Sequence, residues 1–194
     1  MPDLSARIDV SKIDRMYEKL DIAARSAVVG RVISRTNTTM KKVARQEVAK
    51  ELALNASVIN ESLRTSSFRT GRGEARLEVF AQQIPVFRFR NVRSRHPKGV
   101  TVKIRKKRRP VKFRHAFVAT MPNGHIGVFN RNPKAKQKRG PSPNRSGLPI
   151  REVFSQGPFG ILSEKAVGRR ILDAGSKRFI TEYRREVIRK VATR

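Results

Sequence analysis

Cysteine is absent from this chain of 194 residues, and so is tryptophan. Without a thiol the chain can form neither a disulfide nor a metal site with thiolate ligands. Its apolar runs also fall far short of the ~18–20 residues that a membrane-spanning helix needs. The sequence therefore predicts a fold that is stabilised by packing and that has no membrane partner.

Acidic residues are missing from more than a third of the chain. The 73 residues from Val79 to Arg151 contain no Asp or Glu, yet they hold 20 of the 45 Lys and Arg and all three His. The formal net charge of the whole chain is +30. Because such a stretch repels itself, it is most easily kept folded beside a negative partner, and polyphosphate is the commonest one.

Apolar residues make up 38% of the chain, below the ~45–50% that is usual for globular proteins. They recur in periodic runs, which disordered chains rarely contain. The length suggests one domain. We therefore expect a single domain over residues 1–194, with a modest core that neighbouring copies complete.

Apolar residues at helical spacing predict one long helix from about residue 11 to residue 53. A bend would fall near Gly30 or in the β-branched and polar run from Thr36 to Thr39. A stop follows, and one or two further turns end at Leu63. The N-terminal part is thus expected to be helical.

Alternation of apolar and polar residues predicts an antiparallel meander of about five strands in the middle of the chain. Pro122-Asn123-Gly124 is a strong turn signal between the last two of them. One face of this sheet would be apolar and the other basic. The expected strands cover residues 74–80, 84–90, 100–105, 116–121 and 125–130.

After the sheet the composition changes to Pro, Lys and Gly without periodicity, which predicts an exposed basic loop or arm. A short strand or anchor follows. Gly157–Pro158 then begins a final helix that runs to about Val191, with Pro suited to its first turn.

These expectations define an α+β fold, in which long N- and C-terminal helices pack against a small antiparallel sheet and a basic loop extends from it. The expected parts of the single domain are the helical residues 11–63, the sheet 64–131, the basic loop or arm 132–147, and the anchor with the C-terminal helix, 148–194.

The sequence shows no motif or spacing that is typical of a catalytic site. A nuclease or phosphatase needs clustered carboxylates to hold a divalent cation, and the acid-free stretch offers none. The three histidines lack metal-ligand spacing, and the glycine-rich Arg69–Gly73 lacks the ending of a phosphate-binding loop. We expect no catalytic residue, no cofactor and no metal. Four carboxylates at helical spacing beside Lys and Arg are interpreted as solvated ion pairs, namely Glu47, Glu51, Glu182 and Glu186.

The basic residues of the acid-free stretch alternate with Phe and Val, so they should form one face of a sheet. Phe87 and Phe89 have the spacing of core residues, although aromatic rings can also stack on bases. No signature of sequence-specific recognition is present. We predict a surface that faces DNA or an acidic partner, formed by Arg88, Arg90, Arg93, Arg95, Lys103, Arg105, Lys106, Lys107, Arg108, Arg109, Lys112, Arg114, Lys134, Lys136, Lys138 and Arg139.

Six short segments carry a resemblance to a known family. They are Arg69–Gly73, Ile84–Phe87, Gly99–Val102, Ala116–Phe117, Gly127–Arg131, and Leu148–Glu152 before Gly157–Pro158. In their order and spacing the chain resembles the minor tail protein Z family of lambda-like bacteriophages and prophages, which belongs with tail-completion proteins. The similarity covers most of the chain, whereas the basic insert 132–145 is less similar.

The resemblance implies a structural virion protein at the head-proximal end of a long tail. Such proteins finish a tail that can join a head, and they are implicated in placing the end of the packaged DNA in the tail channel. The implied partners are other copies in a ring of six, the tail terminator, tail tube and head–tail connector proteins, and genomic double-stranded DNA. The implied location is the virion tail, with the host cytoplasm during assembly.

Two other classes of function remain open at this point. A nonspecific nucleic-acid-binding protein of nucleoid or ribosomal type suits the composition, but the long amphipathic helices at both ends favour subunit packing. A nuclease would need a carboxylate–metal cluster, which the sequence does not show.

Overall fold

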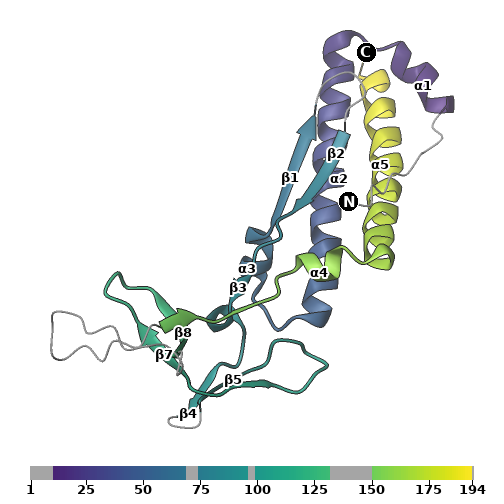
Figure 1. The fold of residues 1–194 in the computed structure, drawn as a ribbon. Helices are drawn as coiled ribbons and strands as arrows, with labels where there is room; N and C mark the ends of the chain where they lie inside the picture. The colour runs from purple at the N-terminus through teal and green to yellow at the C-terminus, as the bar shows by residue number, and fades with distance from the viewer. Residues whose placement is uncertain (1–10, 69–73, 96–98, 132–149, 194) are drawn as a thin grey trace. The chain divides into compact units, whose positions relative to one another are not determined.

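The computed structural model describes residues 11–68, 74–95, 99–131 and 150–193 (Figure 1). Helices and small antiparallel sheets are both present, so the predicted α+β class is confirmed. The chain forms two compact units, here called the helical unit and the sheet unit. The helical unit comprises Met1–Val48, Asn60–Phe80 and Pro158–Arg194, and the sheet unit comprises Ala49–Ile59 and Ala81–Gly157.

Helix α2 (Ile22–Glu51) contributes residues to both units. The single domain expected over residues 1–194 therefore stays a prediction. The short helix α3 (Ala56–Glu61) also spans a boundary between them. Its position confirms the predicted stop after the long helix and the one or two turns that follow. Among the residues that the structure describes, no helix is long and apolar enough to span a membrane.

Two long antiparallel helices, α2 and α5, form the helical unit (Figure 1). Arg31 of α2 pairs with Glu186 of α5, and Arg170 of α5 pairs with Glu47 of α2, so the helices lie side by side along their length. Strands β1 and β2 form an antiparallel hairpin. The remaining elements of this unit are α1 (Ser11–Glu18), β1 (Leu63–Phe68), β2 (Glu74–Val79), α4 (Phe159–Leu162) and α5 (Lys165–Ala192).

The predicted helix over residues 11–53 is interrupted, but the predicted position of the bend is wrong. The helix breaks between Glu18 and Ile22 and then runs without a break through Gly30 and the Thr36–Thr39 run. Asp21 explains the break, because its Oδ1 accepts a hydrogen bond of 2.6 Å from the backbone N–H of Ala24. An aspartate in this position caps the start of a new helix.

Apolar packing holds α1 and the ends of α2 and α5 together. Five residues form a buried cluster, namely Leu20, Val28, Val32, Tyr183 and Val187. The ring of Tyr17 lies 5.7 Å from that of Tyr183, which also stacks on Phe179 at 5.8 Å. The turn after α1 therefore lets the first helix fold back onto α5.

The C-terminal helix begins near Gly157–Pro158 as predicted, but it is not continuous. Helix α4 ends at Leu162, and Glu164 adopts an extended backbone with φ −64° and ψ 127° before α5 begins. A residue in that conformation cannot continue a helix. The final helix is thus a short turn followed by the 28 residues of α5.

Among its described residues, the sheet unit contains three small antiparallel sheets, with strand orders β10-β3, β4-β5-β6 and β7-β8-β9. The predicted single meander of five strands is therefore wrong. The elements are β3 (Ile84–Pro85), the 3-10 helix η1 (Val86–Arg88), β4 (Arg93–Arg95), β5 (Gly99–Val102), β6 (Val111–Phe113), β7 (Ala116–Thr120), β8 (Ile126–Arg131), β9 (Ile150–Glu152) and β10 (Phe154–Ser155).

The expected strand 84–90 is interrupted by a helical turn. After Pro85 the chain turns, and the N–H of Phe89 donates to the carbonyl of Val86 at 3.2 Å. This turn places Val86 and Phe89 in the core and leaves Phe87 36% exposed. Strict alternation along a strand would have put Phe87 and Phe89 on the same side.

The hairpin of β7 and β8 confirms the turn prediction. Gly124 has φ 81°, its N–H donates to the carbonyl of Met121, and the side chain of Asn123 accepts from the N–H of His125. A positive φ costs glycine little conformational energy, whereas it costs most other residues more. The sequence signal and the structure agree here because the turn is local.

Gly99 gives a prediction on the stability of the β4-β5-β6 sheet. Its φ is +95°, and a Cβ at this position would lie 2.3 Å from the carbonyl oxygen of Phe113. We expect Gly99→Ala to cost about 1–3 kcal/mol, from backbone strain together with the clash. Urea unfolding measures this cost.

The matched control for Gly99 is Gly124→Ala, because Gly124 also has a positive φ but no atom within 4 Å of the added Cβ. That variant isolates backbone strain and should lose less stability. Equal losses in the two variants would contradict the role of the Phe113 carbonyl.

Candidate polyanion-binding surface

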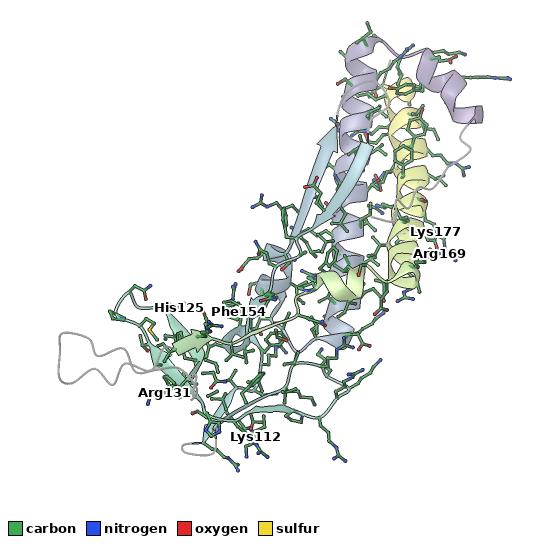
Figure 2. The ribbon with its side chains drawn as sticks, viewed as in Figure 1. Lys112, His125, Arg131, Phe154, Arg169 and Lys177 are labelled. Atoms are coloured by element: carbon green, nitrogen blue, oxygen red, sulfur yellow. The ribbon has the colours of Figure 1, made fainter. Side chains whose placement is uncertain are left out.

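Three basic side chains share one face of the β4-β5-β6 sheet. Arg93 lies opposite Thr101, and Thr101 lies opposite Lys112, so these residues form a row across the three strands. Directly opposed residues of an antiparallel sheet point to the same side, as do residues two apart on one strand. Arg95 therefore joins Arg93 and Lys112, and we call these three residues the basic row. All three are exposed (Figure 2 labels Lys112).

The opposite face of the same sheet is apolar. Val100 and Val102 alternate with Thr101 on β5 and are both 0% exposed. Their register partners are Phe113 and Val111 of β6. On β5 the predicted alternation is present, with buried Val100 and Val102 on one side and Thr101 on the other.

A basic turn follows β5 and is attached to the end of helix α2. Residues 105–109 are Arg105, Lys106, Lys107, Arg108 and Arg109, and we call them the basic turn. The N–H of Lys106 donates to the carbonyl of Glu51 at 2.8 Å, and Leu52 forms a β-bridge with Arg105. The last four residues of the turn are exposed. The backbone of 51–54 thus fixes the base of a turn that presents cations to solvent.

Glu51 also binds this turn through its side chain. The ammonium of Lys107 lies 3.0 Å from Oε1 of Glu51. This hydrogen bond and the positive charges of Lys107, Arg105 and Arg108 lower the pKa of Glu51 below its ordinary value, against a smaller opposing effect of burial. Glu51 therefore stays ionised at neutral pH and neutralises part of the turn.

Other predicted residues lie apart from the basic row. Arg88 is exposed in the 3-10 turn, and Arg90 donates from Nε to Oδ1 of Asn55 at 2.8 Å. Lys103 follows β5 and is half-buried, whereas Arg114 is exposed directly after β6. The predicted surface is thus not one sheet face, because the strand 84–90 turns before its cations can join the sheet. Lys134, Lys136, Lys138 and Arg139 lie outside the described residues.

The β7-β8-β9 sheet contains two contacts of polar side chains that the sequence did not predict. Nε2 of His125 lies 2.9 Å from Oε1 of Glu152, and the guanidinium of Arg131 lies 5.0 Å from the centre of the Phe117 ring (Figure 2 labels His125 and Arg131). Glu152 reaches His125 because β9 pairs with β8 after the long insert. Across the described part of the chain, no three His, Asp or Glu side chains are grouped to hold a metal ion.

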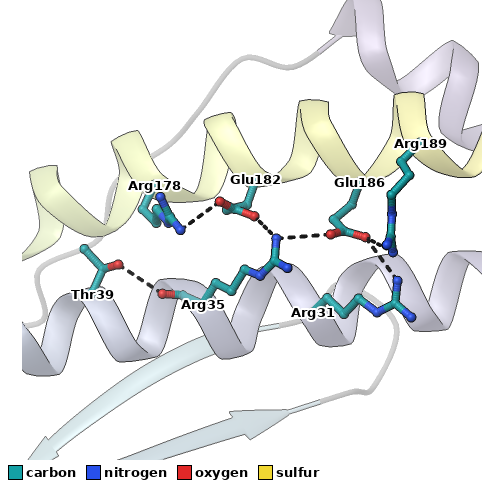
Figure 3. Close-up of polar contacts among 7 residues, drawn as sticks. All are labelled: Arg31, Arg35, Thr39, Arg178, Glu182, Glu186 and Arg189. Carbon is teal, nitrogen blue, oxygen red and sulfur yellow. Dashed lines mark hydrogen bonds and ion pairs between the residues drawn. The ribbon is translucent and has the colours of Figure 1, made fainter.

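The interpretation of Glu182 and Glu186 as solvated ion pairs is wrong. Each residue is 1% exposed, and Glu47 is 8% exposed. Glu182 and Glu186 lie between α2 and α5, where arginines of both helices surround their carboxylates (Figure 3). Only Glu51 of the four remains accessible, with 33% of its side chain exposed.

Arg35 connects the two buried carboxylates. It pairs with Glu182 and lies 3.1 Å from Oε1 of Glu186 (Figure 3). From α5, Arg178 approaches Glu182 at 2.8 Å and Arg189 approaches Glu186 at 2.6 Å, while Arg31 of α2 lies 3.3 Å from Glu186. Four arginines therefore surround two carboxylates.

The arginines determine the charge state of Glu182. The hydrogen bond from Arg35, followed by the charges of Arg178, Arg35 and Arg185, lowers the pKa of Glu182, although burial acts in the opposite direction. These two acids thus partly neutralise the four arginines around them, whose side chains are 41–51% exposed.

Comparison of the chain with family models, curated proteins and solved structures found no match.

Proposed function

We propose that this chain is a structural bacteriophage virion protein that completes the head-proximal end of a tail. It assembles as a ring, supports head–tail joining and positions the end of the DNA in the tail channel. The observation that carries the proposal is the basic row of Arg93, Arg95 and Lys112 beside the basic turn 105–109. The proposal assigns no catalytic role, and it includes packing of the long helices against the small sheets.

The basic surface has little internal compensation, which supports an external negative partner. Within the described residues of the sheet unit, Glu51 and Glu152 are the acids, and they pair with Lys107 and His125. The basic row has no carboxylate of its own unit left to bind. Guanidinium and ammonium groups on an exposed face suit phosphate or carboxylate ligands.

The magnitude of the charge indicates more than one kind of partner. A ring of six copies would carry a formal charge of about +180. A length of roughly 50 Å of duplex offers only about 30 phosphates, at one charge per ~1.7 Å. DNA in the channel would neutralise a minor part of the ring. Acidic regions of tail terminator, tail tube or connector proteins would therefore contact much of the remaining charge.

Electron cryomicroscopy of phage particles that contain the chain tests this function. The expected result is a closed ring between head and tail tube, with the basic row facing DNA density or an acidic neighbouring protein. A single copy at the distal tip of the tail, or absence of the chain from purified particles, would refute the proposal.

A nonspecific nucleic-acid-binding protein is the second candidate, because the same basic row could bind phosphates of any duplex or RNA. This candidate predicts tight binding by the isolated protein at about 0.15 M salt and a steep dependence on salt concentration. Absence of binding under those conditions would eliminate it and leave the virion function in place.

A further inference from the structure

The basic turn links strands β5 and β6, and the segment after helix α2 fixes its backbone. Leu52 forms an antiparallel bridge with Arg105, and the N–H of Ala53 donates to the carbonyl of Ile104 at 2.9 Å. Within the turn, the N–H of Arg108 donates to the carbonyl of Arg105 at 3.3 Å. A backbone that is already ordered loses less conformational entropy when it binds a partner. The turn is therefore a preorganised set of cations.

The side chains of the basic turn favour phosphate over a protein surface. Its five successive residues are all cationic, so no apolar side chain lies between them. Interfaces between proteins have cores that are depleted in charged residues, whereas interfaces with DNA are much more positively charged. Lys112 of the basic row follows Arg109 by three residues, a span of at most about 11 Å. One duplex is therefore large enough to contact the basic row and the basic turn together.

Glu51 opposes such contacts at one position of the turn. It is the last residue of α2, and its Oε1 lies 3.0 Å from the ammonium of Lys107. The side chain of Lys107 is 75% exposed, so a phosphate in solution can approach it. Because the carboxylate and the phosphate bind the same ammonium, the two compete for it.

We propose that the basic turn is a second phosphate-binding site for duplex DNA, and that Glu51 weakens this site by binding Lys107. The proposal rests on the proposed function, since it divides the DNA contacts between the basic row and the basic turn. In the wild type the neighbouring cations of the turn contact phosphates, whereas Lys107 is paired with Glu51. Exposed ion pairs are weak, so Glu51 lowers the affinity without abolishing binding.

The test measures duplex binding by fluorescence anisotropy at several salt concentrations. Lys107→Ala and Lys106→Ala are each compared in the wild type and in Glu51→Gln, and Lys106 is the matched control because it is the exposed lysine beside Lys107. We expect Glu51→Gln to bind about 5-fold more tightly at about 0.15 M salt, with a slope of log K against log salt that is steeper by about 0.9. Lys106→Ala should lower the slope by about 0.9 in both backgrounds, and Lys107→Ala only in Glu51→Gln.

Glu152→Gln is the control for net charge, because Glu152 pairs with His125 on the β7-β8-β9 sheet and not with the turn. Salt screens charges that do not touch the ligand, so this variant should strengthen binding by less than about 2-fold. Circular dichroism checks that each variant is folded.

Three results would overturn the proposal while leaving the basic row in place. They are equal effects of Glu152→Gln and Glu51→Gln, equal slopes for the two lysine variants in the wild type, and a slope that Lys106→Ala does not change. A wild type that binds no duplex even at low salt would overturn it too, and the microscopy of particles would then decide the virion function separately.

Discussion

Replacement of Arg93, Arg95 and Lys112 together by alanine is expected to weaken binding of duplex DNA by about 100-fold at 0.15 M salt. The three side chains form one row on the exposed face of the β4-β5-β6 sheet. Each lost phosphate contact lowers the slope of log K against log salt by about 0.9, so the slope should decrease by about 2–3. Fluorescence anisotropy with a labelled duplex at several salt concentrations measures both quantities.

The matched control replaces Arg169, Lys177 and Arg184 of α5, which removes the same charge from exposed positions of the helical unit (Figure 2 labels the first two). We expect its slope to change by less than one. Equal effects of the two triple variants would mean that net charge, rather than the basic row, governs binding. A wild type that binds no duplex even at low salt would assign the row to acidic protein partners.

Replacement of Glu182 by Gln is expected to destabilise the helical unit by about 1.5–3 kcal/mol at pH 7, the range for hydrogen bonds to charged groups. Glu182 is 1% exposed, accepts a hydrogen bond from Arg35 and forms an ion pair with Arg178. The two arginine side chains are 41% and 44% exposed, so part of their charge is solvated. This keeps the loss below that of a fully buried pair.

The same contacts predict how stability depends on pH. The pKa of Glu182 is lowered in the folded state from an ordinary value of 4.5. A lowered pKa gives stability that is present above pH 4.5 and is lost as the pH falls through the folded pKa. The difference between wild type and Glu182→Gln should therefore shrink in strong acid. Urea unfolding at pH 7 and pH 3, followed by the helical signal, measures this change.

Glu164→Gln is the control for Glu182, because Glu164 is exposed at the start of α5 and caps the helix through no side-chain hydrogen bond. Its substitution should change stability by less than about 0.5 kcal/mol. A loss at Glu182 that remains the same at pH 3 would show that the effect comes from packing rather than from the ion pairs.

Local signals explain most of what could be predicted. The turn Pro122-Asn123-Gly124 determined the β7–β8 hairpin, since a left-handed glycine is a property of four neighbouring residues. The alternation of Val100, Thr101 and Val102 determined which side of β5 is apolar. Similar local signals missed β1, whose residues Leu63–Phe68 have no clear alternation and become a strand by pairing with β2.

The break at Asp21 was also within reach of the sequence, because aspartate is a preferred helix cap. The sequence favoured a bend at Gly30 instead, since glycine weakens a helix. In the structure Gly30 has open space around it and α2 passes through it without interruption. Favourable packing of the long helix outweighs the modest propensity cost of one glycine.

The sequence by itself determined the charge of this protein, its lack of thiols and the period of its strands and helices, because these depend on residue type and short spacing. Only the tertiary structure decided where the acids lie. Arg178 and Glu182 look like an ordinary solvated pair four residues apart, but Arg35 is 147 residues away in the chain. Because α2 lies beside α5, Glu182 is buried, and its negative charge is paired with arginines of both helices.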